Sequence, residues 1–252
     1  MTKIFYHKDL TDEQWNKIKF LFERERKIGR PTMNPRNAFN GILWILRSGA
    51  RWRDLPQRYG NWNSIYYKFR HWIEGGIFEK LLEIVNKKTD NFQLLKIDST
   101  FCKVHQSACS AFKNQEIGSS RGGKTTKIHV VITEHLQLLN AILSAGNIND
   151  NQKAIELLDK INIEDKTILA DKAYGSEQIR CYIERRGASV CIADKCNSTV
   201  KHAFDKELYK KRNLVERFFQ RIKNFRHIAF RFDKLAVCFL NFILIASALI
   251  HF

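Results

Sequence analysis

Two short apolar runs that each end in an aspartate restrict the fold of this chain more than any other feature. Residues 94–97 lead into Asp98, and residues 167–170 lead into Asp171. Apolar runs of this length are typical of strands buried inside a sheet. The pattern also predicts a hairpin of strands at 127–133 and 138–143, helices at 150–161 and 176–186, and a strand at 188–193. Strands that alternate with helices predict an α/β fold.

A third carboxylate, Glu216, lies on a predicted helix downstream of these strands. At 100° per residue, Tyr209, Arg212, Glu216 and Lys223 share a face about 60° wide, opposite the apolar side chains. This polar face could simply be solvated, with an Arg212–Glu216 ion pair worth only about 0.3–0.5 kcal/mol. Three carboxylates with few neutral ligands nevertheless suit Mg²⁺ or Mn²⁺, which prefer oxygen. We therefore take Asp98, Asp171 and Glu216 as a candidate metal site.

Positive charge is concentrated in the two ends of the chain. The net charge is +17, and residues 1–90, 91–200 and 201–252 carry +8, +2 and +7. This charge makes a polyanion the first partner to expect, although a ribosome-associated or merely basic protein would also carry it. The uneven distribution favours an acidic catalytic centre between surfaces that bind a nucleic-acid backbone.

The first 90 residues are predicted to be all-helical and to form a DNA-binding domain of the helix-turn-helix type. One helix is expected after the N-cap Thr11, a second is expected to start at Asn34 and Pro35, and a third is expected after Gly60-Asn61. The third helix has an apolar back and a polar, basic and aromatic front, which is formed by Asn63, Ser64, Tyr67, Lys68 and His71. Such a front is typical of a recognition helix, with Lys68 as a DNA contact. The alternative is an ordinary solvated helix face.

Residues 235–252 contain no Asp, Glu, Lys or Arg and approach the lower length of a membrane span. Asn241, Ser247 and His251 interrupt this segment, so we predict a buried core helix and no membrane contact. The first residues do not have the pattern of a signal peptide, and the six cysteines form no CxxC pair. A cytoplasmic location with reduced thiols is therefore expected.

Several motifs occur in order along the chain. They are Leu10-Thr11-Asp12-Glu13-Gln14-Trp15, residues 40–49, Trp52-Arg53-Asp54-Leu55-Pro56, Ile97-Asp98-Ser99-Thr100, Ser120-Arg121-Gly122-Gly123, Thr125-Thr126-Lys127-Ile128-His129 and residues 169–174. The most specific is Tyr-x2-Arg-x3-Glu-x6-Lys, formed by Tyr209, Arg212, Glu216 and Lys223. With these motifs the chain resembles bacterial DDE transposases of the insertion-sequence-five family along nearly its whole length. Two departures are Ala173-Tyr174-Gly175, where the family usually has Gly-Tyr-Asp, and Ser119, where an Arg is frequent.

The resemblance implies a ribonuclease H-like catalytic core at residues 91–252, after the helical domain at residues 1–90. Asp98, Asp171 and Glu216 would converge on two divalent ions, Mg²⁺ or Mn²⁺, with Asp98 bridging both. Water would free a 3′-OH at the end of the element, and this 3′-OH would then attack target DNA.

The implied substrates are double-stranded terminal inverted repeats and target DNA, bound by a homodimer. Tyr209, Arg212 and Lys223 would hold flanking phosphates, with Arg121 and Lys127 as further DNA contacts. Two alternatives stay open at this point. One is a DNA-binding regulator or a decayed transposase, and the other is a recombinase with Tyr209 as its nucleophile. His105 and His129 are given no catalytic role.

Overall fold

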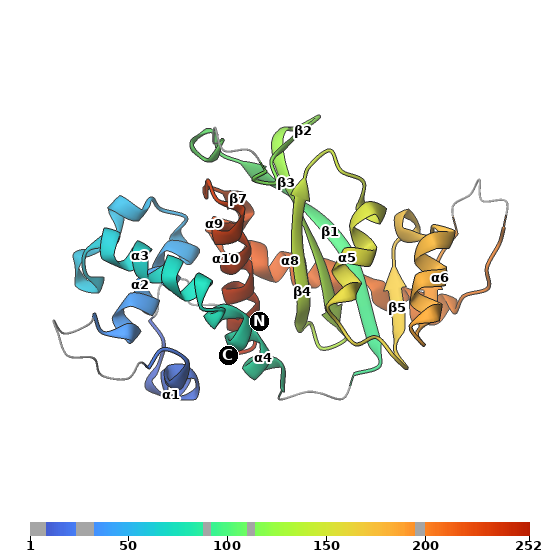
Figure 1. Ribbon diagram of the computed structural model, residues 1–252, viewed down its shortest axis with the longest axis horizontal. Helices are drawn as coiled ribbons and strands as arrows, with labels where there is room; N and C mark the ends of the chain where they lie inside the picture. The colour runs from blue at the N-terminus through green and yellow to red at the C-terminus, as the bar shows by residue number, and fades with distance from the viewer. Residues whose placement is uncertain (1–8, 24–32, 88–91, 110–113, 195–199) are drawn as a thin grey trace.

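The computed structural model describes residues 9–23, 33–87, 92–109, 114–194 and 200–252, which form a mixed α/β structure (Figure 1). A helical region comes first, with α1 (Asp12–Ile18), α2 (Pro35–Ser48), α3 (Trp62–Glu74) and α4 (Ile77–Asn86). The strands that follow are β1 (Leu94–Val104), β2 (Gly118–Ser120), β3 (Gly123–Thr133), β4 (Leu138–Ala145), β5 (Thr167–Ala170), β6 (Ser189–Ile192) and β7 (Phe230–Arg231). The other helices are α5 (Ala154–Asp159), α6 (Glu177–Arg185), α7 (Lys206–Lys210), α8 (Leu214–Lys223), α9 (Arg226–Ala229) and α10 (Ala236–Leu249).

The sheet has β1 at its centre, with β3 and then β4 on one side and β5 and then β6 on the other. β3 runs antiparallel to both β1 and β4, whereas β1, β5 and β6 are parallel. Two short strands pair beside the ends of longer ones. β2 pairs antiparallel with the start of β3, and β7 pairs parallel with the end of β1. This order and mixture of directions is that of a ribonuclease H-like core, so the predicted fold class is confirmed.

Helices cover both faces of the sheet and create two hydrophobic cores. Leu95 and Ile97 of β1 point into the core beneath α5 and α6. Cys102, on the other face of the same strand, joins the core formed with α8 and α10. The alternation along β1 therefore gives Asp98 the face that α8 covers.

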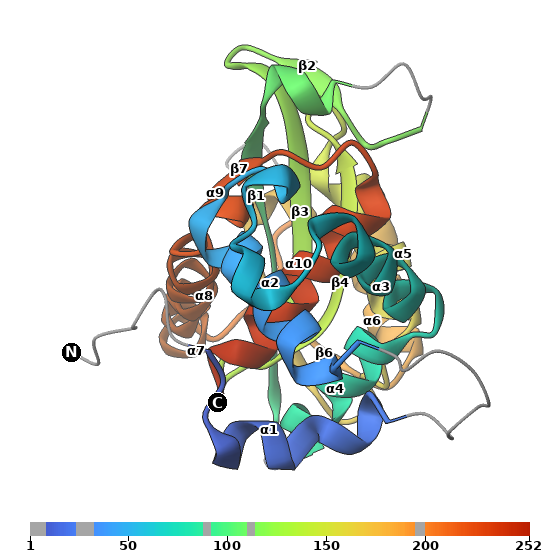
Figure 2. The ribbon, with the colours of Figure 1, turned by 90° about the vertical axis from the view of Figure 1, so that its left-hand side faces the viewer.

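The apolar C-terminal segment is a core helix, as predicted. α10 contacts α3 and α4 on one side and β4 on the other. Seen from the side of the helical region, it lies between that region and the sheet (Figure 2). Within the described residues, no helix is both long and apolar enough to span a bilayer.

The helices of the first region begin where the capping residues predict. Thr11 and Gln14 form the expected capping box of α1, and the side chain of Asn61 caps α3. α2 starts at Pro35 behind the cap Asn34 and ends at Gly49, which has a φ of 66°.

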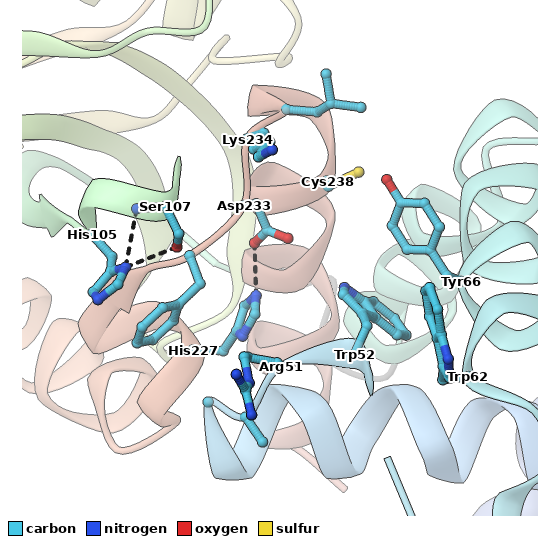
Figure 3. A pocket seen from close by; sticks show the side chains of 14 residues that line it. Arg51, Trp52, Trp62, Tyr66, His105, Ser107, His227, Asp233, Lys234 and Cys238 are labelled. Carbon is cyan, nitrogen blue, oxygen red and sulfur yellow. Dashed lines mark hydrogen bonds and ion pairs between the residues drawn. The ribbon is translucent and has the colours of Figure 1, made fainter. Parts of the chain in front are cut away.

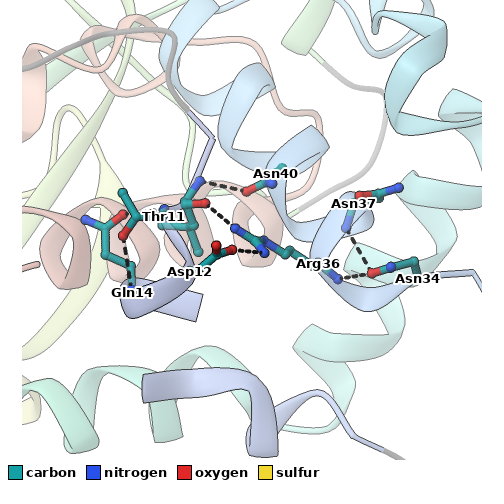
Figure 4. A network of polar contacts seen from close by, with 8 residues as sticks. Thr11, Asp12, Gln14, Asn34, Arg36, Asn37 and Asn40 are labelled. Atoms are coloured by element: carbon teal, nitrogen blue, oxygen red, sulfur yellow. Dashed lines mark hydrogen bonds and ion pairs between the residues drawn. The ribbon is translucent and has the colours of Figure 1, made fainter. Parts of the chain in front are cut away.

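A polar network joins α1 to α2 (Figure 4). Arg36 Nη1 donates to Asp12 Oδ1 at 2.5 Å, and Arg36 Nη2 donates to the carbonyl of Leu10 at 2.8 Å. The buried side chain of Asn40 accepts from the N–H of Leu10 at 3.1 Å. These bonds connect the start of the described chain to a helix far along the sequence.

The predicted division between residues 90 and 91 lies among residues 88–91, outside the described residues. On either side of it, hydrophobic side chains of α2, α3 and α4 share one core with α8 and α10. The helical region is thus packed directly against the covered face of the sheet.

Candidate active site

Parallel pairing of β1 and β5 brings Asp98 and Asp171 together. The last paired residues of this ladder are Ile97 and Ala170, so both aspartates directly follow it in register. Asp171 then caps a short 3₁₀ turn by accepting the N–H of Lys172 at 2.7 Å. The two aspartates lie next to each other because β1 and β5 are parallel and each aspartate is the residue after the last paired one.

Glu216 reaches this edge from α8. The predicted single helix is interrupted, since a 3₁₀ turn at Lys211–Asn213 separates α7 from α8. The predicted apolar side is buried, while the Glu216 side chain is 57% exposed. Arg212 lies between two of the carboxylates, with Nη1 3.7 Å from Asp98 Oδ2 and Nη2 3.6 Å from Glu216 Oε1.

The electrostatics of Asp98 favour a cation beside it. Burial, together with the charges of Asp171 and Asp150, raises the pKa of this carboxyl to about 6. The N–H of Ser99, which donates to Asp98 Oδ1 at 2.8 Å, and the guanidinium of Arg212 act in the opposite direction. The local negative charge is therefore only partly compensated.

The donor set fits a hard divalent ion. All three side chains offer carboxylate oxygens, and the Arg212 guanidinium already lies between two of them. In the part of the chain that the structure describes, no three Asp, Glu, His or Cys side chains are yet gathered closely enough to hold an ion. The candidate ligands therefore share one edge of the sheet without forming a closed site.

Asp150 is a further carboxylate at this edge, and it was not among the site residues predicted from the sequence. Its Oδ1 accepts from Ser99 Oγ and from Lys127 Nζ, both at 2.8 Å. The hydroxyl of Tyr174 lies near the same carboxylates, and burial, together with Asp150 and Asp98, raises its pKa. Asp150 follows the turn after β4, so a carboxylate beyond a strand end was the available signal.

Lys127 is buried in the structure. It was predicted to contact DNA, but the residue is 7% exposed, and its ammonium binds Asp150 and the carbonyl of Ile148. Lys127 pairs with Phe101 in the β1–β3 ladder, and its ammonium lies 4.8 Å from the centre of that ring. An ammonium engaged in a buried ion pair is not presented to a phosphate.

The other predicted DNA contacts differ in exposure. Arg121 is exposed at the turn between β2 and β3, and Tyr209 is half-buried against Phe204. Lys223 donates to Thr100 Oγ1 at 2.6 Å and to the carbonyl of Phe101 at 3.0 Å, so it joins α8 to β1.

α3 has the two faces that the sequence predicts. Ile65, Phe69 and Trp72 are buried, while Asn63, Ser64, Tyr67 and His71 are exposed and Lys68 is partly exposed. The polar face is therefore available to a partner.

Both histidines left out of the site are engaged elsewhere. His129 is fully buried and contacts Ser144 Oγ at 2.7 Å, and burial lowers its pKa to about 4. His105 contacts Ser107 through Nδ1.

Asp98→Asn is expected to stabilise the fold at alkaline pH in the absence of divalent ions. The pKa of Asp98 rises from 3.8 to about 6 on folding, so its ionised form destabilises the folded protein once the pH exceeds both values. Urea unfolding in EDTA should show a free energy of unfolding about 1–2 kcal/mol higher for the variant at pH 8. The gain should disappear below about pH 3, where the carboxyl is protonated in both states. A variant less stable than the wild type at pH 8 would contradict this electrostatic account.

Comparisons with known proteins show which families this chain resembles. A model described as "Putative transposase of IS4/5 family" matches residues 10–82, and one described as "Transposase DDE domain" matches residues 92–250. The chain is 37% identical over 103 residues to the uncharacterized protein y4sN of Sinorhizobium fredii, covering 40% of this chain and 82% of that protein. It is 30% identical over 128 residues to a "Putative transposase for insertion sequence element IS6501" of Brucella ovis, covering 50% and 97%.

Among solved structures, a piggyBac transposase synaptic complex with hairpin DNA matches at 14% identity and a TM-score of 0.39. That match covers 77% of this chain but only 51% of the piggyBac chain, so this chain spans about half the length of that relative. The DDE domain model, by contrast, covers more than half of this chain in one continuous match. The chain therefore belongs to the DDE transposase family.

Proposed function

We propose that this transposase binds the terminal inverted repeats of an insertion sequence, cleaves the DNA at their ends and joins them to target DNA. Asp98, Asp171 and Glu216 would hold two divalent ions, Mg²⁺ or Mn²⁺. The observation that supports this most is the meeting of Asp98 and Asp171 at one strand edge, with Glu216 joined to Asp98 through Arg212. We expect the protein to act on DNA in the bacterial cytoplasm, as a dimer that pairs two ends.

The side chains would divide the work as follows. Two ions, when bound, supply a strong oxygen nucleophile and stabilise charge on the departing oxygen. Asp98 would contribute to both ions, because it lies on the central strand of the sheet. The N–H of Ser99 holds one oxygen of Asp98, which limits rotation of the carboxylate.

Arg212 and Tyr209 are suited to hold a phosphate beside the reacting bond. The guanidinium of Arg212 lies 5.9 Å from the centre of the Tyr209 ring, on the helical segment that carries Glu216. A phosphate can accept a bidentate bond from Arg212. Lys223 would act by fixing β1 at Thr100, and the exposed Arg121 would contact DNA further away.

Asp150 is assigned a positioning role in the same site. Lys127 compensates the charge of Asp150, so this carboxylate is better suited to hold Ser99 than to bind an ion. Ser99 in turn fixes Asp98. Such partners orient the ligands of a metal site without touching the metal.

The direct test uses purified protein and a DNA fragment that carries the inverted repeats bounding its gene. Cleavage that leaves a 3′-OH at the end of the element, followed by joining to a plasmid, should occur with Mg²⁺ or Mn²⁺ and stop in EDTA. Binding of the ends without cleavage in either metal would identify a DNA-binding regulator or a decayed transposase instead.

Tyr209→Phe is expected to lower the cleavage rate by no more than about tenfold, because it removes one hydrogen bond to phosphate. Burial raises the pKa of the Tyr209 hydroxyl, which keeps it protonated and makes it a poor nucleophile. Denaturing gels of the wild type should contain no protein–DNA adduct. An adduct in the wild type that Tyr209→Phe abolishes, together with all cleavage, would establish the tyrosine recombinase alternative.

A further inference from the structure

Arg212 lies between two of the candidate metal ligands. Its Nη1 is 3.7 Å from Asp98 Oδ2 and its Nη2 is 3.6 Å from Glu216 Oε1, so the guanidinium spans the gap between the two carboxylates. Oxygens that share one Mg²⁺ each lie about 2.0–2.1 Å from it. Two carboxylates with a guanidinium between them cannot close on an ion at the same time. Arg212 therefore competes with the ion that Asp98 and Glu216 would share.

The contacts of Arg212 with these carboxylates are weak enough to be exchanged. Both distances are longer than those of hydrogen bonds, and the side chain of Glu216 is 57% exposed. Ion pairs that are open to water contribute little to stability, because the solvent screens them. The side chain of Arg212 is itself partly exposed, so DNA can reach its guanidinium.

A DNA phosphate is a better partner for Arg212 than the two carboxylates are in this arrangement. A guanidinium can donate two parallel hydrogen bonds to a single phosphate. Here, each of its two nitrogens instead faces a different carboxylate from beyond hydrogen-bond distance. Tyr209, whose ring centre lies 5.9 Å from the guanidinium, offers the phosphate a hydroxyl as well. A phosphate that binds Arg212 thus draws the guanidinium away from Asp98 and Glu216.

We propose that Arg212 keeps divalent ions out of the candidate metal site until a phosphate of the transposon end takes its guanidinium. Asp98 and Glu216 are then free to bind an ion, so end DNA and metal strengthen each other's binding. By linkage, the factor by which end DNA raises the affinity for metal equals the factor by which metal raises the affinity for end DNA. The inference rests on the proposed function, because that function supplies both the metal site and the end DNA.

The experiment measures Mn²⁺ affinity from the electron paramagnetic resonance signal of free Mn²⁺. Without DNA, Arg212→Gln should bind Mn²⁺ about 5–20-fold more tightly than the wild type, because the competing guanidinium is gone. With a pre-cleaved end that carries a 3′-dideoxynucleotide, the two proteins should agree within about twofold. The Asp98→Asn complex with the same DNA reports the ions that the DNA itself holds, and this background is subtracted. Arg212→Met replaces Arg212→Gln if circular dichroism shows that the latter does not fold.

Two control variants separate competition from a general loss of positive charge. Arg217→Gln removes the cation that follows Glu216 on α8, where successive side chains project about 100° apart around the helix. Arg51→Gln breaks an ion pair with Asp54 at a cavity of about 660 Å³ (Figure 3), none of whose described lining residues is a candidate metal ligand. Both variants should bind Mn²⁺ within about twofold of the wild type, because exposed charges that do not contact the site are screened.

Three outcomes would overturn the inference while the wild type still cleaves end DNA. Equal Mn²⁺ affinity of the wild type and Arg212→Gln without DNA would show that the guanidinium does not compete. An equal gain in Arg217→Gln would reduce the effect to long-range charge. A gain in Arg212→Gln that end DNA does not shrink would show that the guanidinium stays between the carboxylates. By contrast, Mn²⁺ binding no greater than that of the Asp98→Asn complex, together with no cleavage, would overturn the proposed function itself.

Discussion

Replacing Asp98 by asparagine is expected to lower both cleavage and joining of transposon ends by at least about 1,000-fold. The asparagine side chain would keep the bond from the Ser99 N–H but would lose the charge through which this position attracts a divalent ion. Binding of the ends should stay within about twofold of the wild type, because the proposed DNA-binding surfaces are untouched. The measurement pairs a nicking assay on end-labelled DNA with a binding titration at one salt concentration.

Asp159→Asn is the matched control for this substitution. Asp159 is an exposed carboxylate at the end of α5, where it accepts a hydrogen bond from Tyr182, and α5 covers the other face of the sheet. The Asp159→Asn protein should cleave end DNA at the wild-type rate. If the Asp98→Asn protein still joins DNA, Asp98 is not a catalytic residue.

Replacing Asp150 by alanine is expected to lower the cleavage rate by about 10–100-fold, the usual effect of losing a residue that orients a metal ligand. The change frees Ser99 Oγ and leaves the buried ammonium of Lys127 without its carboxylate. It should also lower the free energy of unfolding by about 3 kcal/mol, because a buried charge loses its partner. Nicking rates and urea unfolding, measured together, separate the two effects.

Lys127→Met combined with Asp150→Asn is the informative comparison. The double variant removes both charges but keeps a side-chain oxygen at position 150 that can accept a hydrogen bond from Ser99 Oγ. It should recover most of the lost stability and stay closer to the wild-type rate than Asp150→Ala. If Asp150→Ala cleaves as fast as the wild type, Asp150 has no positioning role.

Features set by neighbouring residues could be predicted from the sequence. Thr11 caps its helix as expected, and the helices expected to start at Asn34 and after Asn61 begin there with those side chains as caps, because a cap depends only on the next three residues. Asp171 directly follows its strand, as its apolar run predicted, and Asp98 directly follows the part of β1 that pairs with β5. The family resemblance, which rests on short motifs, is confirmed by the two family models.

Features set by distant partners could not be predicted. β1 continues to Val104, past the predicted end, because residues 101–103 pair with β3 although they form no apolar run. Lys127 was expected to contact DNA, and its ion pair with Asp150 could not be foreseen because the two residues stand 23 positions apart along the chain. The position of Arg212 between Asp98 and Glu216 likewise needs the folded sheet. Periodicity describes one element at a time, whereas these contacts join several.

Asp98→Cys tests most directly whether Asp98 binds a catalytic metal ion. A thiolate is a soft ligand that binds Mg²⁺ poorly and Mn²⁺ better. Cleavage of end DNA by the variant, measured in parallel in Mg²⁺ and in Mn²⁺, should be lost in Mg²⁺ and partly restored in Mn²⁺. Cleavage at the wild-type rate in Mg²⁺ would contradict the account, because Asp98 would then not be a ligand.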